Sequence, residues 1–243
     1  MAHTTDGRAR ATLLALLLMV SLVTLALPAS ADPTGANFNS NSTGAIPTNS
    51  PSSITNNRST ITTVVLSAVQ QDSRWKAYVG NVTGSLTLDD ASSNTIYDWS
   101  ALSVPTGEVY ASRSGSVSFA SPQCAQAGTI TAEETALNMT GTEADSINNT
   151  FNGTDHTPTL VAGQTLSSCQ MTSLYVNDAS QGQTSTADFQ EFLMEDATSS
   201  LIYVSIINDN KVGFDGKTYD FQMIVAESNV EAAHPYYFYI ELG

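Results

Sequence analysis

This 243-residue chain contains few residues of the types that carry out nucleophilic or metal chemistry. Its histidines beyond the first few residues are His156 and His234, and each lies close to a proline in a polar segment. Nucleophilic catalysis near neutral pH usually relies on a histidine base. No Gly-x-Ser-x-Gly motif accompanies either residue. We therefore interpret both histidines as surface loop residues.

The two cysteines, Cys124 and Cys169, are 45 positions apart. An even number of cysteines in an exported chain predicts one disulfide, and two buried free thiols are the alternative. A zinc site is not expected, because two cysteines at this distance and two histidines do not form a ligand set.

Oxygen ligands for a hard cation gather in one loop, where Asp209, Asn210 and Asp215 could bind calcium. The spacing does not match a known calcium loop, and ordinary turn chemistry, in which Asn and Asp bond to their own backbone, is the alternative. No phosphate-binding glycine loop or haem attachment motif is present. The sequence therefore predicts no cofactor other than this weak calcium site.

Two tyrosines near the C-terminus are candidates for a binding face. Residues 236 to 242 alternate, so that Tyr237 and Tyr239 are expected on the outer face of a strand. Exposed tyrosines can bind sugars or protein partners, although packing within a sheet is their commoner use.

Glycosylation could occur at six Asn-x-Ser/Thr triplets, three of which fall within a short polar stretch. They begin at Asn41, Asn57, Asn81, Asn138, Asn148 and Asn152. Since a chain with 30 Ser, 30 Thr and 16 Asn produces such triplets by chance, occupancy is an open question.

The N-terminus has the features of a secretory signal. Arg8 and Arg10 precede an apolar run, and Ala29-Ser30-Ala31 supplies small residues for cleavage. The apolar run is short for a membrane span. A second alternative is retention of the apolar segment as a pilin-like helix after cleavage near Arg10. We expect a signal peptide at 1–31, no transmembrane span after cleavage, and a flexible Asn/Ser/Thr/Pro-rich tether at 32–60.

The rest of the chain, 61–243, reads as a single β-rich extracellular domain. Short alternating runs separated by turn residues predict strands, including one at 116–120 and a hairpin over 75–88 that turns at Gly80-Asn81. Thr131 and Glu134 have the spacing of a capping box and predict a short helix. Together these patterns predict a mainly β, antiparallel sandwich-like domain with one or two short helices.

Charge excludes two classes of partner. The net charge is −15 and the pI is near 4.2, so the chain lacks the basic clusters that bind nucleic acid or anionic lipid. In composition and layout it resembles prokaryotic secreted surface proteins, including archaeal ones, of the pilus-associated or adhesin-like kind.

That resemblance implies a non-enzymatic, secreted or cell-surface role in structure or adhesion. The partners would be other surface proteins, or further copies bound by strand addition, and glycans. The alternatives are an extracellular carbohydrate-binding module and, below that, a secreted hydrolase that uses carboxylates.

Overall fold

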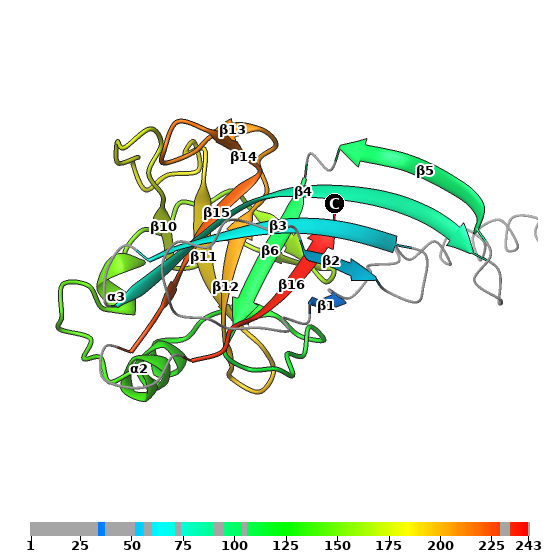
Figure 1. Cartoon of the computed structure of the whole chain (residues 1–243). Helices are drawn as coiled ribbons and strands as arrows, with labels where there is room; N and C mark the ends of the chain where they lie inside the picture. Colours follow the sequence, from blue (N-terminus) through cyan, green and yellow to red (C-terminus); the bar gives the residue numbers. More distant parts are fainter. Residues whose placement is uncertain are drawn as a thin grey trace, which may run out of the picture. The chain divides into compact units, whose positions relative to one another are not determined.

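The computed structural model describes residues 34–36, 52–55, 60–70, 74–89, 95–103, 106–228 and 234–242, with side chains described over 74–82, 106–228 and 234–242. In these residues the structure is mainly β, with antiparallel strand pairing and two short helices (Figure 1). The predicted fold class is therefore confirmed.

Sheet A is the larger of the two main sheets and contains seven strands, all paired antiparallel. Its order is β1 (Thr34–Ala36), β16 (Tyr237–Leu242), β6 (Gly107–Ser112), β12 (Leu201–Ile206), β11 (Gln190–Glu195) and β10 (Met171–Ser173), and β7 (Gln123–Cys124) also pairs with β11. The alternation predicted over 236–242 corresponds to β16.

Sheet B has five strands built around one long strand. Its order is β15 (Phe221–Ala226), β4 (Trp75–Asp89), β3 (Thr60–Gln70) and β2 (Ser52–Thr55), and β5 (Thr95–Ser103) also pairs with β4. The predicted hairpin turn at Gly80-Asn81 is wrong, because β4 continues through both residues. Its partner β3 remains in register across them, with Leu66 opposite Gly80 and Val65 opposite Asn81.

The main core lies between the two sheets. Leu201 and Tyr203 of sheet A and Phe221, Met223 and Val225 of sheet B are among its buried side chains. These residues occupy alternate positions on their strands, as expected for side chains that share one face. The two sheets thus pack as a sandwich.

The opposite face of sheet A is also buried, which the sequence did not predict. Tyr110, Ile202 and Val204 on this face form a second core with side chains from the covering segments, including Phe119 and Leu166. The predicted strand at 116–120 is wrong, since this segment is a turn-rich loop. Both faces of sheet A therefore exclude water.

Two helices and two small hairpins complete the described fold. The helices are α2 (Ala127–Ala136) and α3 (Ile147–Thr150), and the hairpins are β8 (Thr159–Val161) with β9 (Gln164–Leu166) and β13 (Lys211–Val212) with β14 (Thr218–Tyr219). The helix predicted around Thr131 exists but starts earlier, after Gln126. The expected cap residues lie inside it, where Glu134 is buried and its carboxylate accepts a bond from the Asn148 backbone N–H at 2.9 Å.

Two short strands fall inside the segment that was predicted to be a tether, residues 32–60. β1 pairs with β16 and β2 pairs with β3, each as the last strand on its side of a sheet. The strand ladder needs only backbone groups, which explains how a polar, turn-rich sequence can supply both pieces.

Side chains of sheet A bond to the open edge of β15. Ser205 Oγ donates to the Gln222 carbonyl at 2.6 Å, and the Ile224 N–H donates to Glu191 Oε2 at 2.8 Å. The Tyr236 hydroxyl donates to the Ala226 carbonyl at 2.6 Å. Three backbone groups of this edge are therefore already bonded to side chains, which leaves fewer groups free to pair with another chain.

Candidate functional site

Cys124 and Cys169 form a disulfide, as predicted. Cys124 belongs to β7, and Cys169 comes two residues before β10. Both strands pair with the same side of β11, at successive positions. The disulfide therefore joins two segments that meet next to the second core.

His156 is buried, which corrects the prediction of a surface histidine. Its ring stacks on Phe192 at 4.4 Å between centroids, and only 4% of the residue is exposed. Nδ1 lies 2.8 Å from the Thr157 carbonyl, and Nε2 accepts the Cys169 backbone N–H at 3.1 Å. Burial lowers the pKa of His156, so the neutral ring is the form that fits these bonds.

The two candidate tyrosines have different environments. Tyr237 is 36% exposed, whereas Tyr239 is buried beneath Phe119 and its hydroxyl donates to the Ser114 carbonyl at 3.3 Å. The predicted outer face is therefore wrong for Tyr239, because the loop before β7 covers this side of β16. A two-tyrosine binding surface does not form.

The side chains proposed as calcium ligands are bonded to residues near them in the sequence. The Asp215 carboxylate accepts bonds from Lys217 Nζ at 2.7 Å and from the Tyr219 hydroxyl at 3.1 Å. Asn210 donates its side-chain amide to Asp209 Oδ1 at 3.0 Å. Over the described part of the chain, no group of three or more His, Cys, Asp or Glu side chains is arranged to hold a metal ion.

Four of the six candidate glycosylation residues have described side chains, and all four are exposed. They are Asn81, Asn138, Asn148 and Asn152, whereas Asn41 and Asn57 lie outside the described residues. Asn81 is on strand β4 and not at the turn where it was expected.

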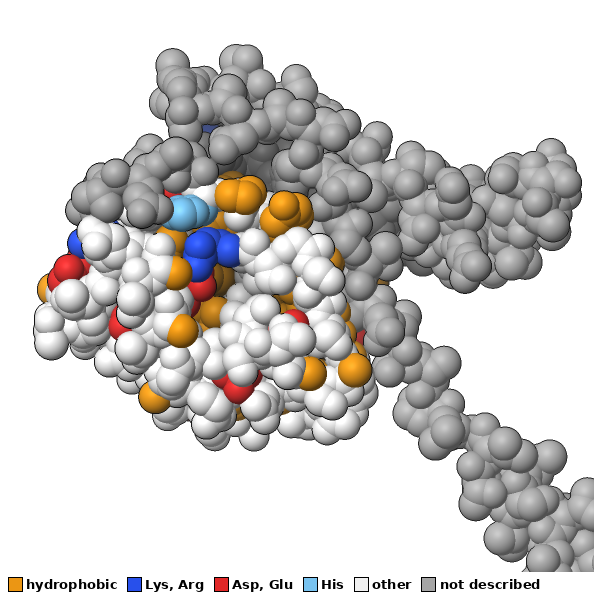
Figure 2. Space-filling view, turned by 90° about the horizontal axis from the view of Figure 1, so that it is seen from below, with side chains coloured by type: hydrophobic (Ala, Val, Ile, Leu, Met, Phe, Trp, Pro, Cys, Tyr) orange, Lys and Arg blue, Asp and Glu red, His pale blue; other side chains and the backbone are white. Residues whose placement is uncertain are grey.

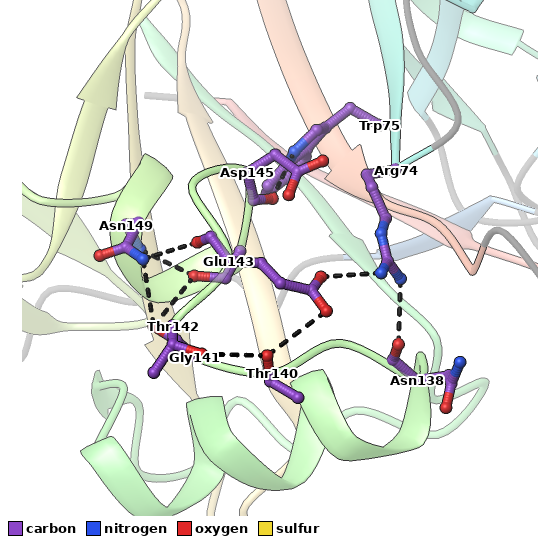
Figure 3. Close-up of polar contacts among 10 residues, drawn as sticks. Arg74, Trp75, Asn138, Thr140, Gly141, Thr142, Glu143, Asp145 and Asn149 are labelled. Atoms are coloured by element: carbon purple, nitrogen blue, oxygen red, sulfur yellow. Dashed lines mark hydrogen bonds and ion pairs between the residues drawn. The ribbon is translucent and has the colours of Figure 1, made fainter.

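A network of polar contacts holds the loop that carries Asn138 and leads to Asn148 (Figure 3). Arg74 donates to the Asn138 carbonyl at 3.0 Å and to Glu143 Oε2 at 2.7 Å. The Asn149 side chain donates to the Glu143 carbonyl at 2.6 Å. This sequon-bearing surface is therefore a fixed loop anchored to the start of β4.

Several acids serve as acceptors for backbone N–H groups far away in the sequence, a role that no local sequence motif predicts. Asp220 accepts the Val82 N–H at 2.6 Å and the Asn210 N–H at 3.0 Å, in the gap where β15 ends along β4 and β5 begins. Glu191 accepts the Ile224 N–H of β15, and burial raises the pKa of Glu191 well above the usual range. These acids support the fold and are not available as solvent-facing catalysts.

One carboxyl pair lies on the second face of sheet A. Glu108 of β6 is directly opposite Glu241 of β16, and the Tyr110 hydroxyl donates to Glu241 Oε2 at 2.7 Å. Burial and the nearby charge of Glu241 raise the pKa of Glu108 to about 8, against a small opposing effect of the bond with Tyr110. At neutral pH Glu108 therefore keeps its proton, because its carboxyl is buried and faces a second acid.

An open pocket of about 370 Å³ lies where the end of β6, α2 and the turn before β12 meet. Figure 2 looks onto the side that carries α2, where basic and acidic side chains lie together beside a hollow. Arg113 and Glu133 line the pocket and form a two-pronged ion pair, with bonds of 2.6 and 2.8 Å. Sequence reasoning missed this site, because the turn before β12 lies more than 60 residues after the other two walls.

Comparisons with family models, with curated proteins and with solved structures find no match to this chain. In the part of the chain that the structure describes, no helix has the length and apolar character to cross a bilayer.

Proposed function

We propose that this protein is a non-enzymatic structural or adhesive protein, exported by its N-terminal signal and acting outside the cell or at its surface. Its partners are other surface proteins or further copies of itself. The observation that carries this proposal is the pairing of two short strands, β1 and β2, from one N-terminal segment with the edges of both sheets. The disulfide supports export, since such bonds persist in oxidising compartments.

Edge pairing of this kind can occur within one chain or between two chains, because the ladder uses backbone groups that every copy presents. β16 is paired on both sides over Phe238–Ile240, and side chains already bond to three backbone groups on the edge of β15. The N-terminal segment, and not the C-terminal strand, is therefore the part best suited to exchange between copies.

A cysteine pair at a position where β1 and β16 are in register tests this proposal. Thr34 lies opposite Ile240, so a Thr34→Cys/Ile240→Cys variant can form a second disulfide. Purification of the exported protein under oxidising conditions should give covalent dimers or longer chains. Disulfides formed only within single chains, together with a strict monomer in size-exclusion chromatography, would contradict assembly by strand exchange.

A carbohydrate-binding module is the second candidate function, and the Arg113–Glu133 pocket favours it. Tyr239 no longer supports this candidate, since it is buried. The third candidate, a hydrolase that uses carboxylates, would rely on Glu108 and Glu241, and Glu241 already accepts bonds from the Tyr110 hydroxyl and the Ala162 backbone N–H. An activity screen with polysaccharide substrates, repeated on Glu108→Gln, would reveal such an enzyme.

A further inference from the structure

The pocket between β6, α2 and the turn before β12 has the size of a small-molecule site. Its volume of about 370 Å³ is near the lower end of the range of about 300–1,000 Å³ that is typical of ligand sites. It is lined mainly by small polar side chains, among them Ser114, Thr129, Ser199 and Ser200. A guest must therefore be small and must offer many hydrogen-bonding groups.

The charges in the pocket cancel locally. Glu133 accepts bonds from Arg113 Nε and Nη2 at 2.6 and 2.8 Å, and both side chains are largely shielded from solvent. An anionic guest would meet an arginine that is already neutralised, on a protein with a net charge of −15, and a cationic guest would meet a paired glutamate. The local chemistry favours a neutral guest.

The ion pair still has hydrogen-bonding capacity that suits hydroxyl groups. A guanidinium has five N–H donors and this pair uses two of them, while each carboxylate oxygen has further lone pairs. Adjacent hydroxyl groups can accept from such a guanidinium and donate to the carboxylate at the same time, because each hydroxyl does both. Serine and threonine hydroxyls around the pair extend the same pattern.

The wall formed by the turn is held in place before any guest arrives. Asp196 accepts backbone N–H bonds from Ser118 at 3.0 Å, from Thr198 at 2.8 Å and from Ser200 at 2.9 Å. Ser199 has a φ of 60°, a left-handed conformation that costs a non-glycine residue energy and that recurs at ligand sites. A fixed wall lowers the ordering cost of binding.

We propose that this pocket binds a neutral polyhydroxylated ring, a single hexose unit of a glycan, with the Arg113–Glu133 pair bonding to adjacent hydroxyls. This inference rests on the proposed adhesive function outside the cell. It names the class of ligand that one surface of the protein would bind. No aromatic residue is among those that line the pocket. Affinity for one ring is therefore expected to be weak, with a Kd on the order of 1 mM.

The test is an NMR titration of the folded, disulfide-bonded protein with glucose, galactose, mannose and N-acetylglucosamine, and separately with sulfate and calcium. At least one sugar should shift the amide signals of Ser114, Thr129 and Ser200. Arg113→Met should weaken this binding at least tenfold. The matched control is Arg74→Met, which breaks the Arg74–Glu143 ion pair outside the pocket and should leave sugar affinity unchanged.

A second pair of variants tests the inference in case Arg113→Met does not fold. Ala132→Phe fills the pocket from α2 without removing either partner of the ion pair and should abolish the shifts, whereas Ala136→Phe, exposed on the same helix but outside the lining, should not. Shifts caused only by sulfate or calcium, no shifts with any probe, or equal shifts in Ala132→Phe would overturn the inference. If that happens while the exported protein still forms assemblies, the pocket assignment fails and the proposed function stands.

Discussion

The two faces of sheet A are both buried, but they are buried in different ways. One face packs against sheet B through regularly alternating apolar side chains, such as Leu193 and Tyr203 opposite Met223. The other is covered by loops and small hairpins, and it contains the disulfide, the buried His156 and the Glu108–Glu241 pair. In regular strands the backbone groups bond to the neighbouring strand, so alternating apolar side chains are enough to bury a face. Covering loops have no such strand pairing, so they need a disulfide and side-chain hydrogen bonds to stay in place.

Breaking the disulfide should produce the largest effect and should act on the loop-covered face first. Cys124→Ser/Cys169→Ser frees a loop of 45 residues and should cost about 4 kcal/mol of unfolding free energy in the entropic treatment. Urea denaturation measures the total loss of unfolding free energy, and hydrogen exchange shows which segments lose protection. Exchange should accelerate at 159–171 before it does in β12, and an even acceleration over both faces would contradict the comparison.

Two neighbouring residues of β11 allow the two faces to be perturbed one at a time, because their side chains point to opposite faces. Leu193 points into the core between the sheets and Phe192 into the loop-covered core. Each alanine substitution should cost about 3 kcal/mol. Leu193→Ala should lower the protection of both sheets together, whereas Phe192→Ala should release the segment around His156 alone. Identical exchange profiles for the two variants would show that the faces unfold as one unit.

The loop-covered face should also make the stability of the protein depend on pH, through Glu108. The pKa of Glu108 is raised from its usual 4.5 to about 8, so the folded protein holds a proton that the unfolded chain has released. Stability from this group is therefore complete below about pH 4.5 and falls as the pH rises towards 8.

Glu108→Gln should remove that slope and raise the unfolding free energy by a few kcal/mol near pH 8, with little change near pH 4. Urea denaturation at several pH values measures this. Glu143→Gln, which breaks an ion pair outside this face, is the control and should leave the slope in place. A slope that persists in Glu108→Gln would assign the titration to another group.

The smallest effect is expected at the exposed sequons. Asn148→Gln should change the unfolding free energy by less than about 0.5 kcal/mol, since the residue is a surface position. In the exported protein it should remove one glycan, which intact-mass measurement detects. A mass that differs from that of the wild type only by the added methylene group would show that Asn148 carries no sugar.

Alternation of apolar residues was enough to predict the antiparallel strands of the main core, because side chains facing a single core repeat every two residues. It failed at Gly80-Asn81, where typical turn residues are carried through a strand by pairing with β3, more than ten residues earlier in the chain. It also failed at Tyr239, because nothing near that residue in the sequence reveals that a loop starting at Arg113 folds over it. The Arg113–Glu133 pocket and the acceptor roles of Asp220 and Glu191 depend on distant partners in the same way.

The disulfide also affects how the protein responds to cleavage by proteases. Cys124 and Cys169 enclose α2, α3 and three of the exposed sequons. A single cut anywhere between them leaves both halves in one covalent molecule, so the loop-rich cover can be nicked without the release of a fragment. Damage to the most accessible part of the chain would be visible by gel only after reduction.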